Sequence, residues 1–231
     1  MSPAQVPVPI CTIDGPSSSG KGTISRIVAA RVGWNLLDSG ALYRLSALAA
    51  ERAGVALDDP AGLAGVAGGL DVRFRSAPDG SEQIELAGED VTQAIRSESC
   101  AAAASKVAVV PELRAALVGL QRSFRRPPGL VADGRDMGSV IFPDAELKIF
   151  LTASADERAR RRHKQLKEQG MNVSLAALSA DISQRDQRDA SRKVAPLRPT
   201  ADAVVIDSTG RTVTEVVNDI LAHASRSIAP R

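Results

Sequence analysis

One glycine-rich segment near the start of the chain limits what the rest can fold into. Residues 10–23 read ICTIDGPSSSGKGT, an apolar run that ends in glycines and a lysine. The frame Gly15-x-x-x-x-Gly20-Lys21 is that of a P-loop, whose backbone N–H groups surround phosphate oxygens while the lysine supplies a positive charge. A helix expected at 21–32 would point its positive end at the same phosphates. The chain is therefore expected to bind a nucleoside triphosphate.

The residue after the lysine distinguishes this P-loop from the commonest kind. Gly22 stands between Lys21 and Thr23, whereas the usual pattern has Ser or Thr directly after the lysine. A Gly-Lys-Gly-Thr ending is typical of nucleoside monophosphate kinases rather than of GTPases or motor ATPases. The expected ATP-binding residues are Gly15, Pro16, Ser17, Ser18, Ser19, Gly20, Lys21, Gly22 and Thr23. The Thr23 hydroxyl is also a candidate ligand for Mg²⁺.

Composition and charge argue against several classes of function. The chain has 231 residues with 29 basic and 27 acidic side chains, and a net charge of +2 does not support non-specific binding to nucleic acid or membranes. No apolar run of about 20 residues and no signal-peptide pattern are present, so a cytoplasmic protein is expected. Two cysteines and two histidines form neither a disulfide framework nor a metal-ligand cluster. We expect a monomer.

Apolar runs and helical patterns alternate along the chain. Runs typical of buried parallel strands occupy residues 8–13, 34–37, 129–132, 147–151 and 203–206. Helical spacing occupies residues 21–32, 41–53, 112–125, 155–168, 175–189 and 213–226. This alternation predicts an α/β fold of three layers, with a five-stranded parallel sheet covered by helices on both faces. Ligands of such sheets bind at the carboxyl ends of the strands.

One interval interrupts this alternation. Residues 71–75 and 83–86 alternate apolar with polar side chains, and Ala-Pro-Asp-Gly-Ser at 77–81 has the composition of a tight turn. We therefore predict an antiparallel hairpin inside an inserted lobe of residues 62–108, which also contains most of an Ala- and Ser-rich helix at 97–109.

Polar residues follow the predicted strand at 34–37. Ser39 is a plausible N-cap for the next helix, and Tyr43, the one tyrosine of the chain, and Arg44 would lie on its first turn. A capping serine with a solvated arginine is the simpler interpretation of this group taken alone. A tyrosine at a position expected to face the ligand instead favours a second substrate.

A glycine-flanked loop, Asp133-Gly-Arg135-Asp136-Met-Gly, follows the predicted strand at 129–132. A carboxylate that ends a strand opposite a P-loop is where a Mg²⁺ carboxylate is expected, so Asp133 is a candidate for the metal, directly or through water. Arg135 is suited to a bidentate phosphate contact and Asp136 to an exocyclic amine. The alternative is a surface ion pair worth about 0–1 kcal/mol, although the two glycines favour a ligand.

Spacing along a later helix gathers arginines on one face. The residues at i, i+3, i+4 and i+7 are Arg185, Arg188, Asp189 and Arg192. Three guanidinium groups repel one another unless an anion neutralises them, as a transferring phosphoryl group would. The preceding helix adds Arg158, Arg160, Arg161 and Arg162. Consecutive side chains point in different directions, so most of these are expected to be solvated, with Glu157, Asp186 and Glu168 as nearby partners.

Together these motifs resemble those of the bacterial cytidylate kinases, a family of nucleoside monophosphate kinases. The resemblance rests on IDGPSSSGKGT, LDSGALYR, DVRF with GEDV, DGRDMG, FPDA, KIFL, RDxRD, VAPL and DST, between residues 10 and 209. It implies transfer of a phosphoryl group from ATP, with Mg²⁺, to CMP or dCMP. It also implies a core of residues 1–61 and 109–231, a monophosphate-binding lobe of residues 62–108 and a helical lid at roughly 155–192.

The resemblance also assigns roles to individual residues. The acceptor nucleotide would be contacted by Ser39, Tyr43 and Arg44, with Arg44 on its phosphate. Cytosine would be read by Ser105, Arg114 and Asp136. Phosphate would be held by Arg135, Arg188 and Arg192, and the sugar and phosphoryl groups by Arg185 and Asp189. The resemblance thus implies catalysis by positioning and by the cations of Lys21, Arg135, Arg185, Arg188 and Arg192, without a strong base.

Other functions stay open at the level of the sequence. A kinase for another small acceptor would differ only in its acceptor, and the DGRDMG loop and the hairpin argue against it. A P-loop switch is disfavoured by Gly22 and by the lack of a readable switch segment. An ATPase that binds nucleic acid is disfavoured because the chain has no basic excess and few stacking residues, with one Trp, one Tyr and four Phe.

Overall fold

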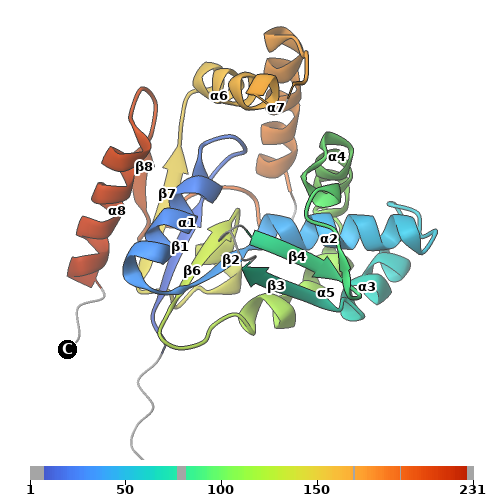
Figure 1. Cartoon of the computed structure of the whole chain (residues 1–231). Helices are drawn as coiled ribbons and strands as arrows, with labels where there is room; N and C mark the ends of the chain where they lie inside the picture. The colour runs from blue at the N-terminus through green and yellow to red at the C-terminus, as the bar shows by residue number, and fades with distance from the viewer. Residues whose placement is uncertain (1–7, 77–81, 169, 193, 228–231) are drawn as a thin grey trace, which may run out of the picture. The chain divides into compact units, whose positions relative to one another are not determined.

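The computed structural model describes residues 8–76, 82–168, 170–192 and 194–227 (Figure 1). The chain divides into two compact units. The first, here the core unit, comprises Met1–Asp38 and Arg122–Arg231, and the second, here the middle unit, is Ser39–Gln121.

A parallel sheet of five strands forms the centre of the core unit. Its strand order is β2 (Asn35–Asp38), β6 (Leu130–Gly134), β1 (Ile10–Asp14), β7 (Leu147–Thr152) and β8 (Val204–Asp207). The five predicted strands are confirmed, with boundaries shifted by at most two residues. Because β1 lies between β6 and β7 and is buried along its whole length, its side chains show no alternation of apolar and exposed polar residues; even Thr12 and Asp14 are buried.

Two helices cover the core-unit sheet from one side. α1 (Lys21–Val32) and α8 (Val213–Ser227) lie side by side (Figure 1), and Ile24, Val28, Val216 and Ile220 pack into one apolar cluster with Ile13 of β1. The four-residue spacing within each pair places both side chains on the same helix face. Packing on the central strand fixes the start of α1, which is where a bound phosphate would lie.

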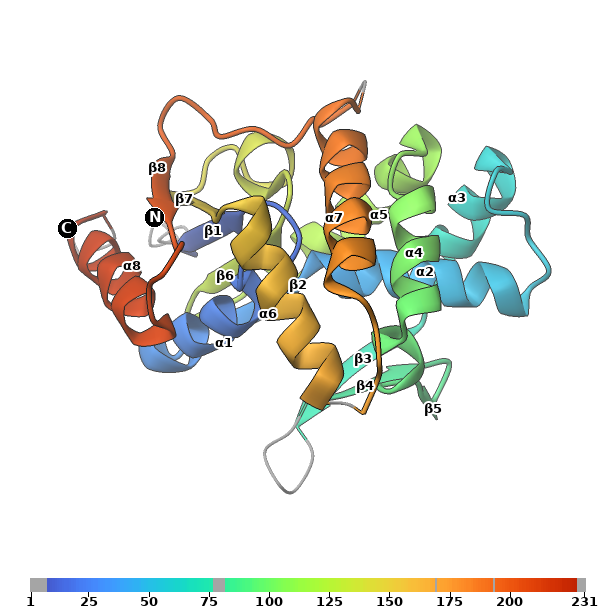
Figure 2. The same cartoon turned by 90° about the horizontal axis from the view of Figure 1, so that it is seen from above.

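A pair of helices follows β7 in the core unit. α6 (Ala155–Glu168) and α7 (Leu175–Ala190) pack against each other (Figure 2), and both begin where the sequence predicts. The Ser174 hydroxyl caps α7 by accepting a hydrogen bond from the backbone N–H of Ala177. α6 and α7 carry the arginines predicted for the lid with the exception of Arg192, which lies two residues beyond the end of α7, so the predicted four-residue stripe is helical only from Arg185 to Asp189.

Four helices build most of the middle unit. They are α2 (Ser39–Arg52), α3 (Pro60–Gly68), α4 (Glu98–Val107) and α5 (Pro111–Arg122). Ala47, Leu63, Val107, Leu113 and Leu117 share one buried cluster. This unit is wider than the predicted lobe of residues 62–108 because α2 and α5 contribute to the same apolar core as α3 and α4. The bounds of the functional lobe stay a prediction.

A small antiparallel sheet completes the middle unit. It consists of β3 (Val72–Ser76), β4 (Glu82–Leu86) and β5 (Glu89–Asp90). Ile84 and Leu86 are buried, while Glu85 between them pairs with Arg75 at 3.1 Å. The predicted hairpin is therefore confirmed in its alternation, and the predicted turn at 77–81 lies outside the described residues.

Several short elements were not predicted. α3 was not predicted, although Asp59 caps it and Pro60 is its first residue, which is a recognisable helix start in the sequence. A 3₁₀ turn (Ala94–Arg96) and a π-helical turn (Met137–Ile141) also appear. Among the helices that the structure describes, none is long and apolar enough to cross a membrane.

Candidate nucleotide-binding site

The P-loop connects β1 to α1, as predicted. Gly15 has φ +151°, and a Cβ placed there would lie 2.0 Å from the backbone oxygen of Leu151 on β7. Gly20, which precedes α1, has φ +92°. Only glycine fits such a close approach and such a backbone angle. The glycine spacing thus reflects backbone packing against β7 at one end and the turn into α1 at the other.

Lys21 is the buried first residue of α1. Its Nζ donates a hydrogen bond to the backbone oxygen of Pro16 at 2.7 Å, so the ammonium group lies inside the loop. Burial, followed by the nearby charges of Arg135 and Arg185, lowers the pKa of Lys21 to about 7, against the opposing effect of Asp133. Cations that destabilise one another in this way form a site that favours an anionic ligand.

Asp133 occupies the predicted place at the carboxyl end of β6. Burial raises the pKa of Asp133 to about 7, against the opposing effect of Lys21. Its Oδ2 lies 3.6 Å from the position that a Cβ would take at Gly22. A buried carboxylate destabilised by its surroundings suits a cation beside the P-loop, and the Thr23 side chain lines the neighbouring cavity.

These two oxygen donors are suited to Mg²⁺, which takes few protein ligands and completes its shell with phosphate oxygens and water. Among the described residues, no cluster of three or more His, Cys, Asp or Glu side chains could hold a metal by itself. The residues present therefore fit an ion that enters together with a nucleotide.

Asp14 is a functional candidate that sequence reasoning missed. It ends β1, and its two carboxylate oxygens accept hydrogen bonds from the backbone N–H groups of Met137 at 2.9 Å and Gly138 at 2.8 Å. Burial raises its pKa to about 6, against the effect of these two bonds. Asp14 thereby fixes the loop that carries Arg135 and Asp136. The available signal was an acidic residue at the end of the strand, directly before the P-loop glycine.

A second cluster joins the loop after β6 to α7. Asp189 is 1% exposed and accepts a hydrogen bond from Nε of Arg135 at 3.1 Å and another from Arg192. Burial alone would raise the pKa of Asp189, but Arg135, Arg192 and Arg185 hold it below its usual value. The structure therefore brings together four residues of the predicted site. Arg188 is half-buried and contacts the Gln184 carbonyl at 3.5 Å.

Arg158 is buried, although most arginines of α6 were expected to be solvated, and its acidic partner is one of those expected. It is 5% exposed, and its guanidinium group donates to the backbone oxygens of Ala153 and Ser17 at 3.0 and 3.2 Å. It also forms a bidentate pair with Asp186 on α7, at 3.0 and 2.5 Å. A buried guanidinium requires this many acceptors, so the helix turns Arg158 toward the P-loop. Arg160, in contrast, is exposed as expected.

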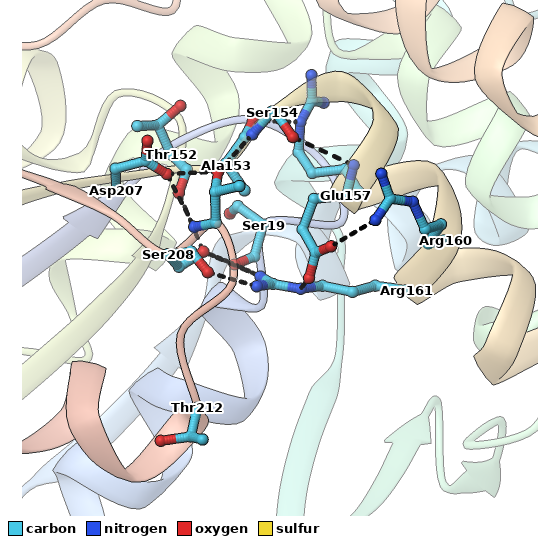
Figure 3. A network of polar contacts seen from close by, with 12 residues as sticks. Ser19, Thr152, Ala153, Ser154, Glu157, Arg160, Arg161, Asp207, Ser208 and Thr212 are labelled. Atoms are coloured by element: carbon cyan, nitrogen blue, oxygen red, sulfur yellow. Dashed lines mark hydrogen bonds and ion pairs between the residues drawn. The ribbon is translucent and has the colours of Figure 1, made fainter.

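Arg161 connects the P-loop to the loop after β8 (Figure 3). It donates to the backbone oxygen of Ser19 at 3.1 Å and to both the hydroxyl and the backbone oxygen of Ser208, at 2.9 and 2.5 Å. Glu157 neutralises it at 2.9 Å. These contacts border a cavity of about 470 Å³ whose lining includes Ser18, Thr23, Arg161, Arg211 and Thr212. The cavity begins at the P-loop and is large enough for part of a nucleotide.

In the middle unit, three predicted acceptor-binding residues are buried. The Arg114 guanidinium carbon lies 5.7 Å from the centre of the Tyr43 ring, and one of its NH groups donates to the Ala108 carbonyl at 3.1 Å. Arg114 is therefore a buried arginine, 6% exposed. Ser105 is 5% exposed, and within the described part of the chain its hydroxyl has no hydrogen-bond partner.

The other two predicted residues of the middle unit lie on α2. Ser39 is the first residue of this helix and is buried, and Arg44 is half-buried one turn later. The backbone oxygen of Arg44 accepts a weak hydrogen bond from the Cys100 thiol at 3.5 Å. In the core unit, Asp136 is 2% exposed, and its carbonyl accepts the N–H groups of Val140 and Ile141 at the start of the π-helical turn.

Comparisons with known proteins agree with this arrangement. The chain matches the family model described as cytidylate kinase over residues 11–226. A cytidylate kinase of Stutzerimonas stutzeri (strain A1501) is 56% identical over 225 residues, which cover 96% of this chain and 98% of that relative. A cytidylate kinase of Pseudomonas aeruginosa (strain UCBPP-PA14) is 56% identical over 221 residues, covering 95% and 96%.

A solved structure also resembles the fold. An uncharacterized protein from Eubacterium ventriosum ATCC 27560 has a TM-score of 0.52 and 12% identity, with 94% of this chain and 98% of that chain covered. At this identity the likeness concerns the fold alone.

Proposed function

The chain belongs to the cytidylate kinase family, and from this membership we propose that it transfers the γ-phosphoryl group of ATP to CMP or dCMP. The observation that carries the proposal is the match to this family along nearly the whole chain. The P-loop gives it a physical basis, because Lys21 is buried there beside Arg135 and Arg185 in a site that an anion would stabilise.

The donor site is assigned to the core unit. The backbone of the P-loop would surround the phosphates of ATP, and Lys21 would turn from the Pro16 carbonyl to a phosphate oxygen. The cavity beside the P-loop would hold part of the nucleoside. Mg²⁺ would bind near Thr23 and Asp133 and would neutralise charge on the phosphate oxygens.

The acceptor is assigned to two sets of residues, one in each unit. In the middle unit they are Ser39, Tyr43, Arg44, Ser105 and Arg114, and in the core unit Arg135, Asp136, Arg185, Asp189 and Arg192. The buried hydroxyl of Ser105 supports this assignment, because a polar atom left without a partner in a packed interior is stabilised when a ligand supplies one. Asp136 would accept the exocyclic amine of cytosine, which uracil lacks.

The reaction would depend on positioning and charge rather than on a general base, since a phosphate oxygen of CMP is already a nucleophile. Asp189 would hold Arg135 and Arg192 at the phosphoryl group by accepting a hydrogen bond from each. Arg185, Arg188 and Lys21 would neutralise the charge that spreads over the equatorial oxygens.

An acceptor panel tests the proposal. Formation of ADP from Mg-ATP would be followed with CMP, dCMP, UMP, AMP and GMP supplied one at a time. Turnover that is fastest with CMP and dCMP is expected. Turnover with another acceptor would favour the alternative kinase, and ADP release without any acceptor would favour the P-loop switch.

Two further expectations concern the assembly and its location. We propose a monomer that works in the cytoplasm. Size-exclusion chromatography with light scattering measures the first directly, and a dimer at micromolar concentration would refute it.

A further inference from the structure

One buried guanidinium group links the P-loop to the helix that carries the predicted lid arginines. Arg158, on α6, contacts the backbone oxygen of Ser17 in the P-loop at 3.2 Å and both carboxylate oxygens of Asp186 on α7. Its Nε donates a hydrogen bond to the backbone oxygen of Ala153, two residues before α6. The planar guanidinium fork provides all these bonds at once, which a lysine ammonium could not reproduce.

The position of Asp186 on α7 explains how this link can affect the predicted lid arginines. Asp186 directly follows Arg185 and lies three residues before Asp189, which is itself tied to Arg135. α7 is therefore held at two points almost one turn apart, by Arg158 and by Arg135. Two such contacts fix both the distance of α7 from the P-loop and its rotation about its own axis. Arg185 directly precedes the first of these contacts on the same helix, so its orientation depends on how α7 is held.

The burial of the pair shows that it is more than a surface ion pair. The Arg158 side chain is 6% exposed and that of Asp186 is 29% exposed. Exposed pairs contribute little, as for Arg160 with Glu157, where the arginine is 66% exposed and the distance is 3.7 Å. Truncating one partner of a buried bidentate pair leaves the charge of the other partner uncompensated. The pair then no longer holds the two helices in place.

We propose that Arg158 and Asp186 are positioning residues for phosphoryl transfer: the pair ties α7 to the P-loop and so holds the α7 arginines at the transferring group. This inference rests on the proposed function. Neither residue needs to touch a nucleotide. The pair acts through Arg185 and Asp189, whose alignment with the phosphates on the P-loop it maintains.

Asp186→Asn is the primary test, because it keeps the shape of the side chain and leaves the contact of Arg158 with Ser17 intact. We expect kcat for CMP to fall about 10- to 100-fold, the size of effect that small misplacements in an active site produce. The KM for ATP should change less than threefold, since the P-loop keeps its own contacts. Asp186→Glu, which restores the carboxylate, should recover at least part of kcat.

The matched control is Asp181→Asn, which makes the same change at an exposed position of the same helix. It should leave kcat within about twofold of the parent. Arg158→Lys is the second test from the other side of the pair, and it should lower kcat in the same way. Melting temperatures are recorded for every variant, and the assays are run well below them.

The outcomes separate the inference from the proposed function. Failure of the parent chain to form CDP from ATP and CMP would refute the function and the inference together. An active parent with Asp186→Asn and Arg158→Lys both within twofold of it would refute the inference alone. A lower melting temperature with unchanged kcat would show that the pair is a structural contact only, and would overturn the inference. An equal loss of kcat in Asp181→Asn would overturn it as well.

Discussion

The close packing of Gly15 against β7 predicts a large cost for adding a single methyl group. In Gly15→Ala the new Cβ would lie 2.0 Å from the Leu151 backbone oxygen, whereas ordinary contact begins at 3.4 Å, so the P-loop or β7 must move by about 1.4 Å. Neither neighbour is the flexible end of a side chain. Overpacking of this kind costs about 1–3 kcal/mol, and the φ of +151° adds about 1–3 kcal/mol of backbone strain.

We therefore expect Gly15→Ala to lower the free energy of unfolding by about 2–6 kcal/mol, measured by urea denaturation followed by circular dichroism. Gly33→Ala is the matched control in the same unit, because Gly33 also has a positive φ, +70°, but nothing lies within 4 Å of its missing Cβ. It should cost only about 1 kcal/mol. The reasoning would be refuted if Gly15→Ala cost no more than Gly33→Ala.

Three further predictions concern other buried groups. Lys21→Met should lower kcat at least about 100-fold yet raise the free energy of unfolding, because it removes a buried cation. Steady-state kinetics measure the first effect and urea denaturation the second. A loss of stability with retained turnover would contradict the assignment. Ser105→Ala should raise the KM for CMP about tenfold. It should leave the free energy of unfolding within about 0.5 kcal/mol, because the hydroxyl has no hydrogen-bond partner to lose in the described part of the chain. An unchanged KM would exclude Ser105 from the acceptor site. Burial raises the pKa of Asp14 from its usual 3.8 to about 6, so between these pH values the folded chain binds a proton that the unfolded chain does not. The free energy of unfolding should therefore fall by up to about 3 kcal/mol as the pH rises from about 4 to 6. Unfolding measured across this range should show a smaller fall in Asp14→Asn, and parallel curves would refute the raised pKa.

The sheet and the P-loop were predictable from sequence because their physical signals are local. A buried parallel strand needs a continuous apolar run, and the five runs became the five strands of the core-unit sheet. The starts of α1 and α6 also match the prediction. The boundaries of the middle unit were not predictable, because α2 and α5 join it through a shared apolar core that no local pattern reveals.

The candidate site likewise contains residues that the sequence predicted and contacts that it did not. Residue types pointed to Asp133, Arg135 and the α7 stripe, and the structure places Asp133 beside the P-loop and joins Arg135 to Asp189. Asp14 and the contact of Arg158 with the P-loop were missed because they depend on partners more than 100 residues away in the chain, whereas Asp186 was expected as a partner of the α6 arginines. A run of arginines on a helix gives no sign of which one turns inward. Only the position of α6 relative to the P-loop decides it.

The roles of the individual site residues stay predictions. Asp136 is buried at the start of the π-helical turn, and Arg188 is half-buried on α7. Their contacts with a nucleotide await measurement of the variants. Asp136→Asn should raise the KM for CMP more than that for UMP, because the carboxylate is assigned to the exocyclic amine of cytosine.

The most direct test of the account is ³¹P NMR of the protein mixed with ATP, Mg²⁺ and CMP. The account predicts that ADP and CDP appear in equal amounts, with no inorganic phosphate beyond that of a sample without protein. ADP accompanied by inorganic phosphate, with CMP unchanged, would contradict it and identify the chain as a hydrolase.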